Sequence, residues 1–354
     1  MHDAQVIEAT VKSIQPVAQA WLDKAYARLD ALTKPKRSLG YLEELAARTV
    51  AILEQDRPTV TGRRVFVFVG DHKVVEEGTS AYPSAVTALM VKNFIAGGAA
   101  INVLSRRAGA AIEVIDVGML DDVPAMPGFI KLNVKRGAAN IAQGPAMTLD
   151  EVYQAVAVGI HRAHLAADQQ VTLMATGEMG IGNTTPAAAL LSAFLNLPAL
   201  ETVGPGTGLD RQGVSHKVAV VERALMMNAG LCAGPLETLA ALGGLEIAGI
   251  CGLCLGAASR RRPVVVDGFI SSLGALTAMR VCPAVKAYLV FAHMSAEPGH
   301  RKFFEREKLR PVLDLGMRLG EGTGAMIAMQ VIEDALAIYN EMATFADAGI
   351  APGA

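Results

Sequence analysis

The stretch Val171-Thr-Leu-Met-Ala-Thr-Gly-Glu-Met-Gly-Ile-Gly-Asn-Thr-Thr-Pro186 decides the fold. Residues 171–175 are apolar and predict a buried strand, whereas the Asn-Thr-Thr-Pro end predicts the first turn of a helix. The glycines between them, including Gly180, let a phosphate approach free backbone N–H groups at the positive end of the helix dipole. The stretch therefore predicts a strand, a glycine turn and a helix that together bind an anion.

Glu178 is an unexpected residue for this turn, because a carboxylate repels a phosphate. One interpretation is that Glu178 acts chemically on a substrate that carries the phosphate. The other is that it caps its own turn. The residues of the stretch leave both interpretations open.

Apolar runs alternate with helical patterns along the rest of the chain. Further strands are predicted at residues 64–69, 111–117, 263–266 and 287–292. This alternation predicts an α/β fold with a doubly wound, mainly parallel sheet in three layers, similar to a Rossmann fold. We expect a large α/β domain over residues 31–285. A small helical domain is expected from residues 1–30 and 286–354, and it contributes the loop of a candidate catalytic glutamate.

Composition limits the partners and the compartment. A net charge of −2 argues against nucleic acid as a partner. The N-terminus lacks the apolar core of a signal peptide, and the apolar segment 241–258 contains Glu246 and several glycines, so it predicts a buried helix and no membrane span. The 4 cysteines are too scattered for a disulfide framework, which predicts a cytoplasmic protein.

Several familiar binding motifs are absent or misplaced. No Walker A sequence occurs, and no glycine pattern of the dinucleotide-binding type follows a predicted strand. Cys251 and Cys254 have the spacing of a redox or zinc pair, but they lie in the apolar segment and are predicted to be core residues. Paired acidic runs that could hold Mg²⁺ are also missing, so we expect neither a metal nor a cofactor.

Polar groups in glycine-rich loops remain as candidates for chemistry. Lys217 follows a second glycine loop, which contains Gly206, and it is either a charge for a phosphate or an exposed surface lysine. Ser295 lies beyond the last predicted strand. Glu321 stands between two glycines, where burial would raise its pKa and make it a candidate general base. The alternative for Glu321 is an acid in the first turn of the last helix.

Six runs of the sequence carry a shared resemblance. They are Gly177-Glu-Met-Gly-Ile-Gly-Asn-Thr-Thr185, Ser80-Ala-Tyr-Pro83, Gly97-Gly-Ala-Ala-Ile-Asn-Val-Leu104, Val264-Val-Val-Asp-Gly-Phe-Ile270, Ser295-Ala-Glu-Pro-Gly-His300 and Leu319-Gly-Glu-Gly-Thr-Gly324. Together they resemble one enzyme family, nicotinate-nucleotide–dimethylbenzimidazole phosphoribosyltransferase, which makes the lower nucleotide of cobalamin. The resemblance extends from about Leu32 to the C-terminal helix.

The resemblance implies transfer of the 5-phosphoribosyl group of nicotinate mononucleotide to 5,6-dimethylbenzimidazole, which gives α-ribazole 5′-phosphate and nicotinate. It also implies a homodimer. Glu321 matches the family's general base, and Glu178 matches a second acid near the ribose. The remaining matches place Gly180, Gly206 and Lys217 on the phosphate and ribose, Ser295 near the phosphate or nicotinate, and Ser80 and Leu319 in the base pocket.

The sequence departs from the family pattern at Lys73, at Lys36-Arg37 and at Leu89. These departures leave the acceptor open among 5,6-dimethylbenzimidazole, another benzimidazole, a purine and a differently substituted ring. Two other functions stay open as well. One is a non-catalytic nucleotide sensor, and the other is a nucleotide N-glycosidase in which Glu321 would activate water.

Overall fold

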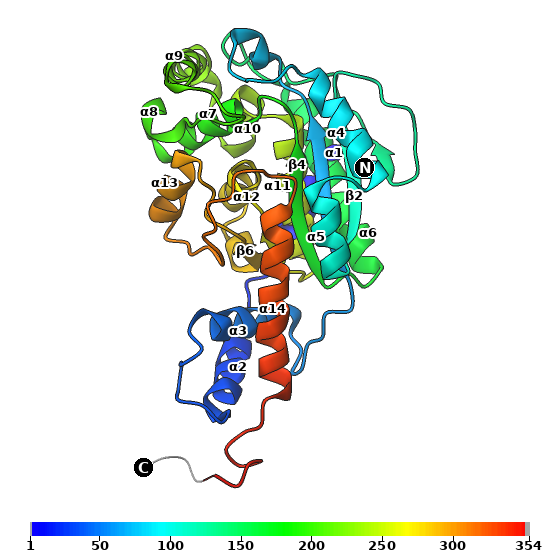
Figure 1. Ribbon diagram of the computed structural model, residues 1–354, viewed down its shortest axis with the longest axis vertical. Coiled ribbons are helices and arrows are strands. Elements are labelled where there is room, and N and C mark those ends of the chain that lie inside the picture. Colours follow the sequence, from blue (N-terminus) through cyan, green and yellow to red (C-terminus); the bar gives the residue numbers. More distant parts are fainter. Residues whose placement is uncertain (1, 351–354) are drawn as a thin grey trace.

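A single six-stranded sheet organises the chain in the computed structural model, which describes residues 2–350. The strand order is β3-β2-β1-β4-β5-β6, and every neighbouring pair is parallel. Figure 1 shows helices on both sides of this sheet, so the predicted doubly wound fold is confirmed. The strands are β1 (Arg63–Gly70), β2 (Ala111–Gly118), β3 (Phe129–Lys131), β4 (Leu173–Met179), β5 (Val264–Val266) and β6 (Leu289–Phe291).

Alternating side chains of the strands enter two separate hydrophobic cores. On β1, Phe66 and Phe68 enter one core, and Val65 and Val67 enter the other. The first core is completed mainly by α1 (Asp3–Ser13), α6 (Leu149–Asp168), α7 (Thr184–Leu195), α8 (Ala199–Thr202), α9 (Arg211–Asn228), α10 (Pro235–Leu242), α11 (Leu245–Ser259), α12 (Phe269–Val281) and α13 (Pro298–Glu307). The second is completed by α2 (Gln19–Ala31), α3 (Tyr41–Leu53), α4 (Ala85–Ala96), α5 (Ala100–Ala108) and α14 (Thr323–Glu341).

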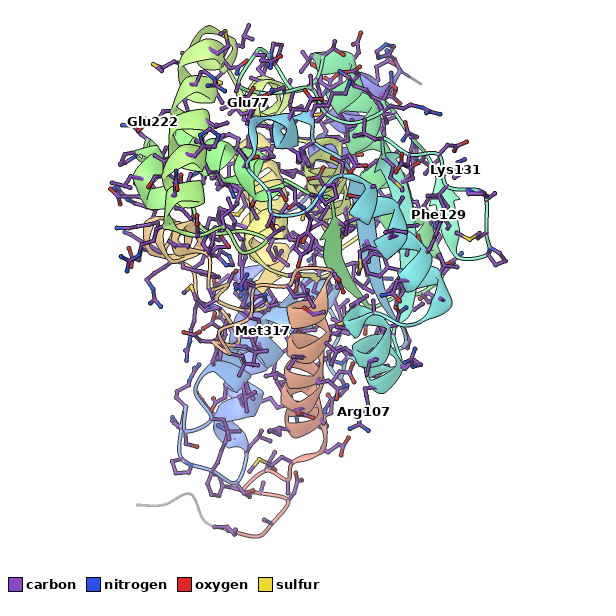
Figure 2. The ribbon with its side chains drawn as sticks, turned by 45° about the horizontal axis from the view of Figure 1, so that its top comes forward. Glu77, Arg107, Phe129, Lys131, Glu222 and Met317 are labelled. Carbon is purple, nitrogen blue, oxygen red and sulfur yellow. The ribbon has the colours of Figure 1, made fainter. Side chains whose placement is uncertain are left out.

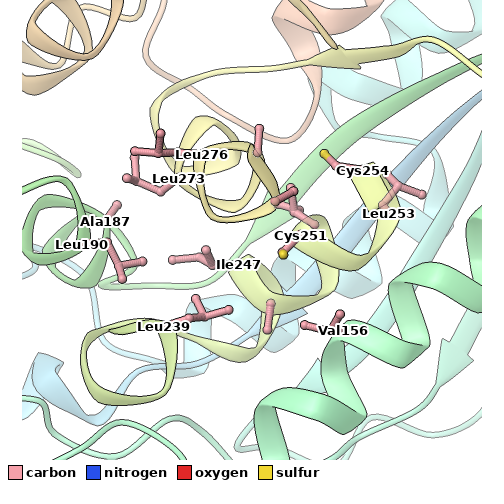
Figure 3. Packing of buried hydrophobic residues seen from close by; sticks show 14 of the residues in the cluster. Val156, Ala187, Leu190, Leu239, Ile247, Cys251, Leu253, Cys254, Leu273 and Leu276 are labelled. Atoms are coloured by element: carbon pink, nitrogen blue, oxygen red, sulfur yellow. The ribbon is translucent and has the colours of Figure 1, made fainter. Parts of the chain in front are cut away.

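The apolar segment 241–258 lies inside the protein, divided between the end of α10 and α11. Cys251 and Cys254 are fully buried in the first core, and Figure 3 shows them among side chains of the neighbouring helices. All four cysteines carry free thiols. The prediction of a buried helix with core cysteines is therefore confirmed.

A helical unit projects from one end of the sheet (Figure 1). It is formed by α2, α3 and α14, which pack on one another, and Arg28 of α2 donates a hydrogen bond to the backbone oxygen of Tyr339 at 2.8 Å. Its limits differ from those expected. Helix α1 packs on α6 and α11, and β6 belongs to the sheet because Val265 and Val290 pair in register. The unit is therefore built from residues 19–53 and α14.

One edge of the sheet is marked in Figure 2. Phe129 and Lys131 mark β3 at one edge, and Glu222 of α9 marks the opposite side of the molecule. Strand β3 was not predicted from sequence, since it is only 3 residues long and lies in a turn-rich segment. Its pairing with Val114 of β2, opposite Phe129, places it in the sheet.

One stretch, residues 85–108, is long and apolar enough to cross a membrane by length and composition. In the structure this stretch is two helices, α4 and α5, separated at Gly97, whose φ of 80° is left-handed. Of the apolar window, 39% is buried inside the protein.

Candidate active site

A cavity of about 420 Å³ opens at the carboxyl ends of the strands. The chain reverses its winding direction between β1 and β4, the position at which sheets of this order bind ligands. The cavity is lined by the end of β4, the start of α7, a glycine loop, the segments after β5 and β6, and the loop before α14. The lining includes Glu178, Gly180, Asn183, Thr184, Gly206, Phe269, His293, Ser295, Glu297, Arg318, Leu319 and Glu321.

Glu178 is the last residue but one of β4, so it lies on the strand and not in the turn that follows. Its side chain is buried, and Asn183 at the N-cap of α7 donates a hydrogen bond to its Oε2. Burial raises the pKa of Glu178 to about 8, and the negative charge of Asp267 adds to that increase. The carboxylate accepts this bond from a side-chain amide and lines the cavity. The interpretation that Glu178 caps its own turn is therefore wrong.

Glu321 lies in the loop before α14 with a left-handed φ of 65°. Its carboxyl group is buried at the cavity wall, and Oε2 has no hydrogen-bond partner among residues 2–350. Burial raises the pKa of Glu321 to about 7, the backbone N–H of Ile101 acts in the opposite direction, and Asp267 raises it further. A carboxyl group with this pKa is suited to accept a proton near neutral pH.

The two glutamates are brought together by glycines that have no room for a side chain. A Cβ on Gly320 would lie 2.2 Å from Oε1 of Glu178, and a Cβ on Gly177 would lie 2.7 Å from the backbone oxygen of Glu321. The end of β4 and the loop before α14 are therefore in direct contact. The two candidate acids both line the cavity.

Asp267, after β5, fixes the loop that carries Glu321. Its Oδ2 accepts a hydrogen bond from the N–H of Gly322 at 3.1 Å, and its Oδ1 accepts one from Ala325 at 2.9 Å. The side chain is 1% exposed, and burial raises its pKa, whereas nearby His293 lowers it. Sequence analysis did not identify Asp267, although it lies in the motif Val264–Ile270.

The glycine loop, with Lys217 behind the lining residue Thr184, forms the part of the cavity suited to an anion. Lys217 is buried, and its Nζ donates to Oγ1 of Thr184 at 2.6 Å, so it is not a surface lysine. Burial lowers its pKa to about 8, and the charge of Glu297 opposes that decrease. Gly206, with a φ of 53°, donates its N–H to Oε1 of Glu297 at 2.9 Å, and Arg318 donates to its carbonyl oxygen at 3.0 Å.

The remaining wall is apolar and suits a flat ring. Tyr82, Val86 and Met90 come from α4 and the segment before it at intervals of four residues. Ser80 does not line the cavity, and its Oγ lies 3.2 Å from Oγ1 of Thr207, a lining residue. Leu89 is 59% exposed and does not line the cavity either. Met90, the next residue, lines the cavity.

The structure thus gathers most of the predicted site residues around one space. Glu178, Gly180, Gly206, Ser295, Leu319 and Glu321 line it directly, whereas Ser80 and Lys217 contact residues that line it. The lining residues that sequence analysis did not single out include Tyr82, Met90, Asn183, His293, Glu297 and Arg318. Tyr82, Asn183 and Glu297 stand inside quoted motifs, so a closer reading of those motifs would have found them.

Across the part of the chain that the structure describes, residues 2–350, no group of three or more His, Cys, Asp or Glu side chains is placed to hold a metal ion.

Comparison with known proteins gives one consistent result. A family model described as phosphoribosyltransferase matches residues 14–350. The chain is 52% identical over 344 residues to nicotinate-nucleotide–dimethylbenzimidazole phosphoribosyltransferase of Chlorobium chlorochromatii, and the match covers 97% of each chain. It is 49% identical to the enzyme of that name from Geobacter sulfurreducens, and that match covers 98% of this chain and 99% of the relative. It also resembles the crystal structure of CobT from Thermus thermophilus, with a TM-score of 0.90 and 46% identity, over 94% of this chain and 100% of that one.

Proposed function

The chain belongs to the nicotinate-nucleotide–dimethylbenzimidazole phosphoribosyltransferase family, and from this membership and the cavity we propose that it transfers the 5-phosphoribosyl group of nicotinate mononucleotide to 5,6-dimethylbenzimidazole or a related base. The products are an α-ribotide, α-ribazole 5′-phosphate for the named base, and nicotinate. The observation that carries the proposal is the pair Glu178 and Glu321, two buried carboxyl groups on segments in direct contact, which line one cavity with an apolar wall and a buried lysine beside it.

The donor is held at its phosphate. Lys217 supplies a positive charge beside the glycine loop around Gly206, and charged groups of this kind bind phosphate in proteins. Gly180 and Ser295 border the ribose and nicotinate. The nicotinate ring of the donor is a cationic pyridinium, and it leaves as a neutral ring nitrogen. Its departure therefore requires no proton from the enzyme.

The acceptor occupies the apolar wall near Tyr82, Met90 and Leu319. One ring nitrogen attacks C1′ on the face opposite nicotinate, so the C1′–N bond to nicotinate breaks as the new C1′–N bond forms and the β-linkage becomes α. Glu321 accepts the proton from the other ring nitrogen. Such positioned proton transfer is worth about 10²- to 10⁴-fold in rate.

Glu178 acts on the ribose. The carbon under attack has oxocarbenium character, as in glycoside transfer. A cationic donor beside Glu178 opposes the effect of burial on its pKa and favours the ionised form, and the carboxylate then stabilises the positive charge that develops at C1′. Glu178 and Glu321 therefore have separate roles, one at the sugar and one at the base.

The proposal is tested by chromatography of the products formed from nicotinate mononucleotide and 5,6-dimethylbenzimidazole, with wild-type protein and Glu321→Ala. Wild type should give an α-ribotide and nicotinate, and the variant should lose most of that activity. Ribose 5-phosphate formed regardless of the acceptor would instead identify a hydrolase. Binding of the nucleotide without turnover by either protein would identify a sensor.

Two further proposals concern the state of the protein. We propose a homodimer, supported by exposed apolar side chains such as Leu89 on α4 and Val103 on α5, and light scattering of the purified protein tests it.

We also propose a cytoplasmic location, supported by four free thiols, which suit a reducing compartment. Fractionation of the source cells tests the location.

A further inference from the structure

His300 is a fully buried histidine in the first turn of α13 that takes no part in the proposed chemistry. Its Nδ1 accepts a hydrogen bond from the backbone N–H of Ser295 at 2.9 Å. Its Nε2 lies 3.0 Å from Oγ of Ser272 on α12. The ring packs against Phe303 and Phe304, at centroid distances of 5.7 and 4.7 Å.

These contacts define the protonation state of the ring. A backbone N–H can only donate, so Nδ1 must carry a lone pair and the proton must lie on Nε2. Oγ of Ser272 then accepts that proton. Protonation of Nδ1 would place two N–H groups against each other. Burial lowers the pKa of His300 well below its usual value, and His293, at a centroid distance of 6.5 Å, lowers it further.

A chain of hydrogen bonds connects His300 to the anion-binding end of the cavity. Ser295, held by His300, accepts at its Oγ the N–H of Glu297 at 3.3 Å. Glu297 in turn accepts the N–H of Gly206 at 2.9 Å, and its backbone oxygen accepts the N–H of His300 at 3.0 Å. The segment 295–300 is thus closed by hydrogen bonds among its own residues. Its member Glu297 connects it to the glycine loop.

We propose that His300, as a neutral ring with its proton on Nε2, is a positioning residue that holds Ser295 and Glu297 in place and thereby sets the loop at Gly206 to receive the phosphate of the donor. His300 does not line the cavity, so it acts through these residues and not on the substrate. The inference rests on the proposed function for the identity of the ligand. The state of the ring does not depend on it.

The proposal predicts a selective effect on donor binding. His300→Phe keeps a packed aromatic ring but leaves the N–H of Ser295 without an acceptor. An unpaired buried donor is costly, so the KM and the calorimetric Kd for nicotinate mononucleotide should rise about tenfold or more. The KM for the base should stay close to the wild-type value. His300→Asn, whose side-chain oxygen lies near the position of Nδ1, should recover part of the donor affinity.

A matched control and a spectroscopic measurement complete the test. His164→Asn alters another histidine that contacts a serine, Ser259 at 2.9 Å, outside the cavity, and it should leave donor binding unchanged. Ring nitrogen shifts in wild type should show a proton on Nε2 of His300 at every pH from about 5.5 to 8.5, because of the lowered pKa.

Three results would overturn the inference. One is wild-type donor affinity in His300→Phe, and a second is an equal loss of affinity for donor and base that His300→Asn does not restore. If neither variant folds, the ring nitrogen shifts of the wild-type protein decide, and a proton on Nδ1 would refute the proposal. Wild-type protein that fails to bind nicotinate mononucleotide at all would instead refute the proposed function.

Discussion

Two glutamates of the same sheet, Glu113 on β2 and Glu178 on β4, have opposite surroundings. Near the start of its strand, Glu113 pairs both carboxylate oxygens with cations, Oε1 with Arg64 at 2.7 Å and Oε2 with Arg162 at 2.6 Å. Near the end of its strand, Glu178 accepts a hydrogen bond from the side-chain amide of Asn183, and no cation pairs with it among residues 2–350. The charged group with the largest effect on its pKa is the negative Asp267, which raises it.

The difference separates stability from chemistry within one sheet. At the amino ends of the strands, the attraction of two arginines offsets the desolvation of a glutamate at a partly buried position. At the carboxyl ends, a buried carboxylate without a cation is costly when ionised, and its pKa rises in response. Glu178 and Glu321 are two such groups, and both line the cavity. Of the two glutamates compared, the one without a cation is therefore the one that lines the cavity.

The largest expected effect distinguishes the two glutamates by activity. Glu178→Gln should lower kcat about 10²-fold, because the charge that stabilises the developing cation is lost. Glu113→Gln should leave kcat unchanged and lower the free energy of unfolding by about 1 kcal/mol, because Arg64 and Arg162 lose a charged partner at a partly exposed site. Steady-state kinetics and urea denaturation of both variants measure this. Equal kcat values in the two variants would refute the distinction.

The pH dependence of kcat, measured with saturating donor so that the bound cation keeps Glu178 ionised, gives the next effect. Activity should rise through pH 7 as Glu321 loses its proton, and it should fall through pH 8 as Lys217 loses its charge. Below pH 7 the decrease should be roughly tenfold per pH unit. In Glu321→Gln the residual activity should lack the acidic limb and keep the alkaline one. An acidic limb that survives in this variant would assign it to another group.

The pH dependence of stability provides a smaller contrast. The pKa of Glu178 is raised in the folded protein, so its contribution to stability is complete below its unfolded value of 4.5 and is lost as pH rises through about 8. Relative to wild type, Glu178→Gln should therefore gain in free energy of unfolding between pH 5 and pH 8. Urea denaturation at the two pH values measures the change. A constant difference between the two proteins would contradict the raised pKa.

The smallest effect concerns the acceptor. Met90→Ala enlarges the apolar wall of the cavity, so it should raise the KM for 5,6-dimethylbenzimidazole and favour larger bases. Leu89→Ala changes the neighbouring residue on the exposed side of α4 and should leave base preference unchanged. Competition between two bases, followed by chromatography, compares the variants. A change of preference in Leu89→Ala alone would contradict the placement of the base.

The sequence predicted the sheet well, because parallel strands that are buried on both faces are continuous apolar runs. It did not predict β3, which is too short to have a pattern, or the division of residues 1–30 into α1 and α2. The limits of the helical unit also required the structure, because an amphipathic helix such as α1 does not indicate which partner its apolar face meets.

The site was predicted where a residue type is unusual for its surroundings. Glu178 and Glu321 are acids among glycines, and that contrast is visible in the sequence. Asp267 and His300 were not singled out, because their importance depends on backbone groups that lie far away in the chain, such as the N–H groups of Gly322 and Ser295. Leu89 was named as a departure from the family pattern and Met90 was not singled out, since the sequence alone does not define which residues of α4 face the cavity.

The most direct test of the account is a crystal structure of Glu321→Gln with nicotinate mononucleotide and 5,6-dimethylbenzimidazole bound together. We expect the side-chain amide at position 321 within about 2.6–3.2 Å of one base nitrogen, with the other nitrogen facing C1′. The phosphate should lie against Gly206 and Lys217, and the carboxyl group of Glu178 beside the ribose. A base bound away from residue 321, or a phosphate bound away from Lys217, would contradict the account.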